Sequence, residues 1–206
     1  MNFNLKTITA PTAEPITLDE AKAQCRVDIA DDDALIGALI TAAREEVERQ
    51  SYHALMTQTL EMILTAWPYD HPILPGWYTG HIRLPRPPLQ SVTSVTYKDY
   101  TGTVRTMTVN TDYVVAGDSI PAEVMPPYAK TWPPVVLHAA EPIRVRYVCG
   151  YADAASVPDS LKLAVKLLVG HWYENREASN PMLLRDIPRG VDALCMSYRM
   201  KAKVWG

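Results

Sequence analysis

Apolar residues recur at the spacing of an α-helix in three long stretches of the chain. This spacing predicts helices over residues 31–51, 158–176 and 189–201. The apolar positions that define them are Leu35, Ile36, Leu39, Ile40, Ala43 and Val47 in the first, Leu161, Ala164, Val165, Leu168, Trp172 and Tyr173 in the second, and Val191, Leu194, Cys195 and Tyr198 in the third. Each helix is expected to pack one face into a core.

Two further signals mark the points where helices begin. Thr17 is followed three residues later by Glu20, which is the spacing of a capping box, so a short helix is expected over residues 17–28. The acidic run Asp31-Asp32-Asp33 should supply cap oxygens and negative charge to the start of the next helix. A calcium loop would need a glycine and a terminal glutamate that are missing at the required spacing, so we interpret the run as structural.

The region between residues 56 and 150 has the patterns of β-strands. The segments with this pattern are Leu60–Leu64, Val92–Tyr97, Val104–Val109, Tyr113–Val115 and Ile143–Val148. Turn residues at 99–102 should join the second and third segments into a hairpin. The six prolines between residues 121 and 142 predict an irregular loop, because proline cannot donate a hydrogen bond to a sheet.

The order of these segments predicts an α+β fold. Two N-terminal helices and the long helix 158–176 would form a helical core, with the β-rich region 56–150 as an insertion. We expect one domain over residues 1–188, followed by a C-terminal helix and basic tail over residues 189–206. No internal repeat of fixed period is visible in the sequence.

The helix predicted over 158–176 is apolar on two faces. Leu163 and Leu167 lie on a different face from the positions that define its core stripe. A helix with two apolar faces must be buried on two sides. We therefore expect one face to meet the core and the other to meet a neighbouring subunit.

The segment 67–80 combines turn residues with large aromatic rings. It contains three prolines and two glycines, and its aromatic residues are Trp67, Tyr69, Trp77 and Tyr78. These rings can cover the sheet of their own subunit, or they can contact a neighbouring subunit or a tail-side partner. The sequence leaves both alternatives open.

Charge is distributed unevenly along the chain. The net charge of -3 and the pI near 5.9 give no overall attraction to DNA or to an acidic membrane surface. Residues 1–50 nevertheless contain ten acidic against five basic residues, whereas residues 181–206 contain two against five. The basic end is either a solvated terminus or a tail that docks on an acidic partner, with Trp205 as an apolar anchor.

No motif for catalysis or for binding a cofactor is present. The five histidines and three cysteines do not form a metal-ligand pattern, and the glycines form neither a phosphate-binding loop nor a nucleophile elbow. We therefore expect no enzymatic activity, no cofactor and no metal site. The scattered cysteines suit a reducing cytosol, and we expect neither a secretion signal nor a membrane span.

The order of several segments resembles the head–tail connector proteins of tailed phages, also called head-completion or adaptor proteins. The segments that carry the resemblance are Pro15–Lys22, Asp31–Ile36, Ile82–Val92, Tyr97–Gly102, Tyr147–Tyr151 and Val157–Arg176. No single segment is diagnostic, since a capping box occurs in many proteins. The ordered set, which spans about residues 15 to 177, carries the resemblance.

The resemblance implies a structural subunit of a homo-oligomeric ring, made in the host cytoplasm and located at the head–tail interface of the virion. Such a ring has about twelve copies, binds below the portal protein and meets a stopper or tail-completion protein. Double-stranded DNA would pass through its channel without sequence-specific binding.

For this chain we expect the C-terminal segment to reach the portal, through Arg189, Arg199, Lys201, Lys203 and Trp205. Two rival classes remain open at this point. One is a small cytosolic enzyme whose catalytic groups meet only in the fold. The other is a host adaptor module that acts as a monomer or dimer.

Overall fold

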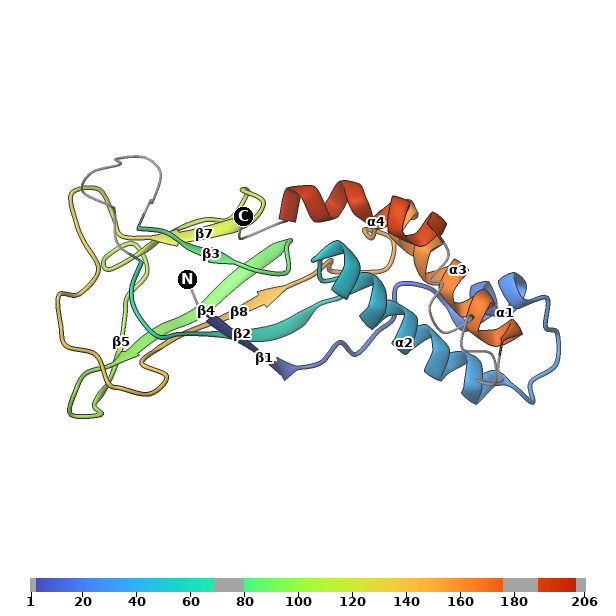
Figure 1. Ribbon diagram of the computed structural model, residues 1–206, viewed down its shortest axis with the longest axis horizontal. Helices are drawn as coiled ribbons and strands as arrows, with labels where there is room; N and C mark the ends of the chain where they lie inside the picture. Colours follow the sequence, from blue (N-terminus) through green and yellow to red (C-terminus); the bar gives the residue numbers. More distant parts are fainter. Residues whose placement is uncertain (1–2, 69–79, 176–188, 203–206) are drawn as a thin grey trace. The chain divides into compact units, whose positions relative to one another are not determined.

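The computed structural model describes residues 3–68, 80–175 and 189–202 (Figure 1). Over these residues the chain forms four helices and eight strands, and the strands pair antiparallel, which confirms the predicted α+β class. Two compact units are present. A sheet unit contains the described residues up to Ala10 and the segment Gln58–Gly150, and a helical unit contains Pro11–Thr57 and the described residues from Tyr151 onward.

The helical unit contains all four helices, and each lies close to its predicted position. They are α1 (Leu18–Cys25), α2 (Asp33–Ser51), α3 (Asp159–Glu174) and α4 (Arg189–Ala202). Their apolar faces meet in one core, whose fully buried members include Ile36, Val47, Leu161, Leu168 and Val191. From the sequence we expected residues 189–206 to follow the domain as a separate helix and tail. In the structure α4 packs on α2 and α3 and contributes to this core.

The predicted capping box at the start of α1 is confirmed. The Glu20 backbone N–H donates to Thr17 Oγ1 at 3.2 Å, and the Thr17 N–H donates to Glu20 Oε2 at 2.8 Å. The other carboxylate oxygen of Glu20 accepts a hydrogen bond from Lys166 Nζ on α3 at 2.8 Å. The cap therefore also joins α1 to α3.

The predicted role of the acidic run before α2 is corrected. Asp32 is the N-cap residue, but its side chain makes no capping hydrogen bond. Its Oδ2 accepts a hydrogen bond from the Tyr173 hydroxyl of α3, and Asp33 Oδ1 accepts one from Lys22 Nζ of α1 at 2.7 Å. These two carboxylates link helices instead of capping one, since they bind long polar side chains from α1 and α3.

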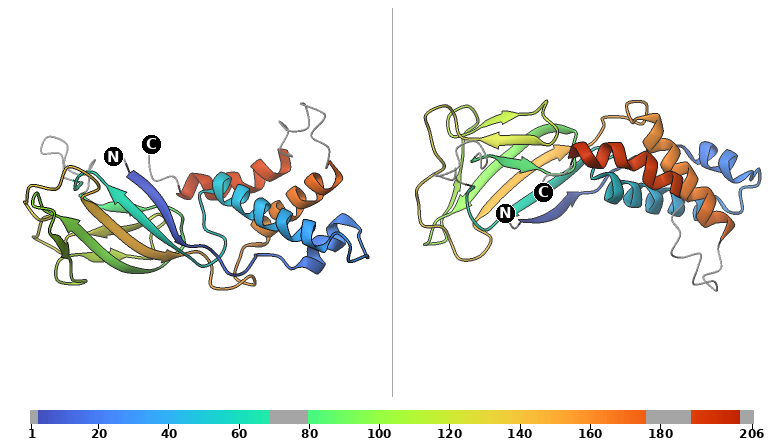
Figure 2. Two further views of the ribbon diagram at one scale, coloured as in Figure 1. Left: turned by 90° about the horizontal axis from the view of Figure 1, so that it is seen from below. Right: turned by 45° about the horizontal axis from the view of Figure 1, so that its top comes forward.

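The sheet unit contains two antiparallel sheets. The larger has the strand order β1 (Phe3–Thr9), β2 (Gln58–Leu64), β8 (Ile143–Cys149), β4 (Leu89–Lys98) and β5 (Val104–Thr106). The smaller has the order β3 (Ile82–Leu84), β7 (Ala122–Met125) and β6 (Val114–Ala116). Figure 2 shows the smaller sheet lying against one face of the larger. The Tyr147 hydroxyl of β8 donates to Pro85 O at 2.8 Å, which helps to hold the segment after β3.

The proline-rich segment contains a strand that the sequence did not predict. β7 lies between Pro121 and Pro126 and is the central strand of the smaller sheet. Its four residues, Ala122–Met125, include no proline, so their N–H groups can pair with β3 and β6. The prediction of an irregular loop over the whole segment was therefore wrong. β1 and β3 were also missed, since β1 has little buried side-chain surface and β3 has only three residues.

Candidate interaction surfaces

The described residues hold no group of three or more acidic, histidine or cysteine side chains placed to bind a metal ion. Burial raises the pKa of Cys195 to about 11, so its thiolate is scarce at neutral pH. Among the described helices, none combines the length and the hydropathy that a bilayer span requires.

Arg199, one of the predicted contact residues, makes hydrogen bonds within the helical unit. Its Nε donates to Gln50 O, in the last turn of α2, at 2.7 Å, and its Nη2 donates to Asp192 Oδ1 at 2.7 Å. Arg189 is exposed at the start of α4. Lys203, Trp205 and the side chain of Lys201 lie outside the described residues.

Tyr198 is a second anchor of α4, although the sequence pattern predicted only a place in the core for it. Its ring meets the buried His53 ring edge-on, with centroids 5.3 Å apart. Its hydroxyl lies 3.0 Å from Ser160 Oγ at the start of α3. Together with Arg199, it attaches the last turns of α4 to two different parts of the helical unit.

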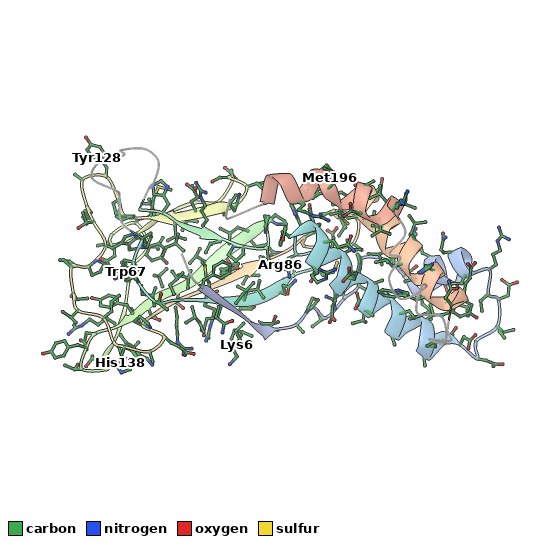
Figure 3. All side chains as sticks on the ribbon, in the orientation of Figure 1. Lys6, Trp67, Arg86, Tyr128, His138 and Met196 are labelled. Atoms are coloured by element: carbon green, nitrogen blue, oxygen red, sulfur yellow. The ribbon has the colours of Figure 1, made fainter. Side chains whose placement is uncertain are left out.

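The second apolar face predicted for α3 is divided in the structure. Leu163 is 46% exposed, whereas Leu167 is half-buried beside Gly190 of α4. Met196, on α4, is 55% exposed and projects from the helix in Figure 3. The structure thus leaves apolar side chains exposed on both α3 and α4.

Trp67 belongs to an aromatic cluster inside its own sheet unit. Its ring stacks on Trp132, with centroids 4.6 Å apart and planes at 5°, and meets Tyr97 edge-on. Trp132 Nε1 donates to Gly80 O, which fixes the stack beside the end of the segment 67–80. Tyr69, Trp77 and Tyr78, the other predicted contact residues of this segment, lie outside the described residues.

One face of the larger sheet carries a buried carboxylate between two arginines. Glu61 of β2 lies opposite Arg146 of β8. Its carboxylate accepts hydrogen bonds from Arg144 Nη1 at 2.7 Å and Arg146 Nη2 at 2.8 Å. Burial alone would raise the pKa of Glu61, but the hydrogen bonds from Arg146 and Arg144 outweigh it and hold the pKa below its usual value.

Replacing Glu61 by glutamine should lower the stability of the sheet unit by about 1–2 kcal/mol at neutral pH. A depressed native pKa means that the contribution of Glu61 is present above its unfolded pKa and is lost as the pH falls below about 4.5. The wild type should therefore lose stability more steeply than the Glu61→Gln variant between about pH 5 and pH 3. Urea denaturation of both proteins at several pH values in this range measures the difference. Equal acid slopes for the two proteins would contradict this role.

An exposed apolar surface lies where β4 turns into β5. Tyr100 is 73% exposed, Val104 57% and Val136 73%. Tyr100 N–H donates to Val136 O at 2.9 Å, and Lys98 pairs with Val104 across the two strands. We call Lys98, Tyr100, Val104 and Val136 the β-tip patch. His138, whose N–H donates to Lys98 O at 3.1 Å, marks this end of the unit in Figure 3.

The helical unit has an exposed acidic surface between α1 and α2. Ile29 is 60% exposed and Leu35 is 39% exposed. Asp28 and Asp31, both exposed, lie next to them in the sequence. We call these four residues the acidic turn. Apolar side chains beside charged ones make this turn a candidate surface for contact with another protein.

The chain belongs to the phage gp6-like head-tail connector protein family. The model of this family matches residues 15–126 and 136–199, which includes α1, α2, α3, the part of α4 up to Arg199 and most of the sheet unit. This confirms the resemblance drawn from the sequence. The chain is therefore a structural connector subunit of a phage-like particle, located at the head–tail interface of the virion.

Solved structures with the same fold come from gene transfer agent particles. One is the virion of the native particle, with a TM-score of 0.73 at 22% identity over 95% of this chain and 94% of that chain. The neck of the empty particle, computed with C6 symmetry, gives 0.73 at 22% identity over 95% of both chains. The neck of the native particle, computed with C12 symmetry, gives 0.69 at 22% identity over 97% and 95%. No curated protein sequence matches the chain.

Proposed function

We propose that the chain forms a ring of about twelve copies that binds below the portal protein and joins the DNA-filled head to a stopper or tail-completion protein. The observation that carries this proposal is the family match over most of the chain. Similar folds in a particle neck computed with C12 and C6 symmetry support a ring. The net charge of -3 suits a channel through which DNA slides without tight phosphate binding.

The proposal assigns the basic C-terminal end to the portal. Arg189 is exposed on α4, and Lys201, Lys203 and Trp205 follow near the chain end. Arg199 already holds α4 to the C-terminal end of α2, so its first role is to position the segment. The exposed Leu163 and the segment 67–80 are assigned to a neighbouring subunit or to the tail side.

Deleting residues 189–206 is a poor test of portal binding, because α4 contributes Val191 and Cys195, both fully buried, to the core. Charge reversal near the chain end leaves these residues in place. Lys201→Glu combined with Lys203→Glu should weaken binding of the full-length chain to the purified portal at least tenfold, measured by biolayer interferometry, because the two new carboxylates would repel an acidic groove on the portal that the lysines attract.

A matched control reverses two cations of the sheet unit, Lys6→Glu with Lys130→Glu. Lys6 is exposed on β1, and Lys130 makes only an exposed hydrogen bond to Thr111 O. This variant should bind the portal as the wild type does. Undiminished binding by the Lys201→Glu/Lys203→Glu variant would overturn the assignment of this end to the portal, although ring formation would still stand.

A further inference from the structure

The β-tip patch and the acidic turn are complementary in both charge and polarity. The β-tip patch combines the half-buried Lys98 with exposed Tyr100, Val104 and Val136. The acidic turn has the exposed Asp28 and Asp31 within a few residues of the exposed Ile29 and Leu35 in the sequence. Each surface therefore offers apolar area to bury and a charge that the other can pair.

The charges at the centre of the two surfaces are available for a partner. Within residues 3–68, 80–175 and 189–202, neither Asp28 nor Asp31 makes an ion pair, and the same is true of Lys98. Asp99, next to Lys98, does not neutralise it, because its carboxylate accepts hydrogen bonds from Thr101, Thr103 and Arg105 of the same turn.

Neighbouring charges leave the sign of each surface unchanged. Asp33 is paired with Lys22, and Asp32 accepts the Tyr173 hydroxyl. Arg26 is the one basic residue between positions 26 and 35, against four acidic residues. The acidic turn is therefore net negative, and the β-tip patch is positive.

A closed ring of identical subunits needs two different surfaces on each subunit that fit each other, because its contacts are heterologous. We propose that the β-tip patch of one copy docks on the acidic turn of the next copy, with Lys98 facing Asp31. This inference rests on the proposed ring and names the surfaces that close it. The occupant of each surface is a second copy of this chain, because the two surfaces carry opposite charge and both expose apolar side chains.

Charge reversal within one chain tests the pairing, since every copy carries both surfaces. Asp31→Lys alone and Lys98→Glu alone should each lower the fraction of full-length protein in rings at least tenfold. The double variant Asp31→Lys/Lys98→Glu should restore ring formation, because the pair then has opposite signs again. Native mass spectrometry with and without the purified portal measures the ring fraction, and Asp118→Lys, an exposed position outside both surfaces, is the control.

The possible outcomes separate this inference from the ring itself. Rings from both single variants would overturn the two surfaces but leave the proposed ring standing. Loss in both single variants without rescue in the double variant would overturn the pairing and assign the surfaces to other partners, such as a tail-side protein. A wild type that forms no ring even on the portal would overturn the proposed function and this inference with it.

Discussion

Replacing Arg44 by methionine should lower the free energy of unfolding of the helical unit by about 3 kcal/mol. The Arg44 side chain is 6% exposed and binds Glu14 Oε2 at 2.8 Å and Glu48 Oε2 at 3.5 Å. Glu48 is itself buried, and its other oxygen accepts the Leu55 N–H at 2.8 Å. Without Arg44, the carboxylate of Glu48 stays buried and loses its cation.

This substitution also affects the chain outside α2. Glu14 precedes α1, and Leu55 follows α2, so Arg44 and Glu48 together tie both flanking segments to the middle of the helix. Urea denaturation followed by far-ultraviolet circular dichroism measures the loss. We expect the amide protons of residues near Glu14 and Leu55 to exchange faster in the same variant.

The control for Arg44 lies on the same helix. Arg49 also pairs with a glutamate, Glu46, at 2.6 Å, but its side chain is 65% exposed. Arg49→Met should therefore cost less than about 1 kcal/mol, because an exposed pair gains little over hydration. Equal losses for the two variants would show that burial does not set the strength of the Arg44 cluster.

Replacing Leu168 by alanine should cost about 3–4 kcal/mol, through lost burial and the cavity that remains. Leu168 is fully buried at the centre of the helical core, where α3 packs on α1, α2 and α4. Thermal unfolding of the full-length chain, followed by helical signal, should show the transition of the helical unit shifted to lower temperature.

The same substitution at Leu163 is the control. Leu163 lies on α3 but is 46% exposed, so Leu163→Ala should cost less than about 1 kcal/mol in the isolated chain. If Leu163 contacts a neighbouring subunit, as proposed, this variant should keep its stability and lose assembly. A large loss of stability at Leu163, comparable with that at Leu168, would place it in the core of the isolated chain.

The helices could be predicted from the sequence because their signals are local. Thr17 and Glu20 are three residues apart, and the apolar stripe of α3 repeats within single turns, so both can be recognised without knowing the fold. The role of Asp32 could not be predicted in this way. Its partner, Tyr173, is separated from it by 141 positions, and only the packing of α3 on the start of α2 brings the two together.

The strands show the same limit. β8 alternates clearly, because Ile143, Val145 and Tyr147 are buried on one side while Arg144 and Arg146 hold Glu61 on the other. β7 has only four residues between two prolines, and its neighbours β3 and β6 are needed to show that it is a strand.

The contact candidates depended still more on the fold. The β-tip patch was not predicted, because Tyr100 and Val136 are far apart in the sequence and meet only through a backbone hydrogen bond. Ile29 and Leu35 were also missed as a surface. Leu35 was interpreted as part of the buried stripe of α2, but it lies in the first turn of the helix, where it remains 39% exposed.

The chain order of the two units has a consequence for synthesis on the ribosome. α1 and α2 are made first, but the core that buries them needs α3, which begins only at Asp159, after the whole of the segment 58–150. At about 5–20 residues per second, the first two helices wait roughly 5–20 s for their partners. Until then Ile36, Ile40 and Val47 have no completed core, so this apolar surface stays exposed on the nascent chain during the interval.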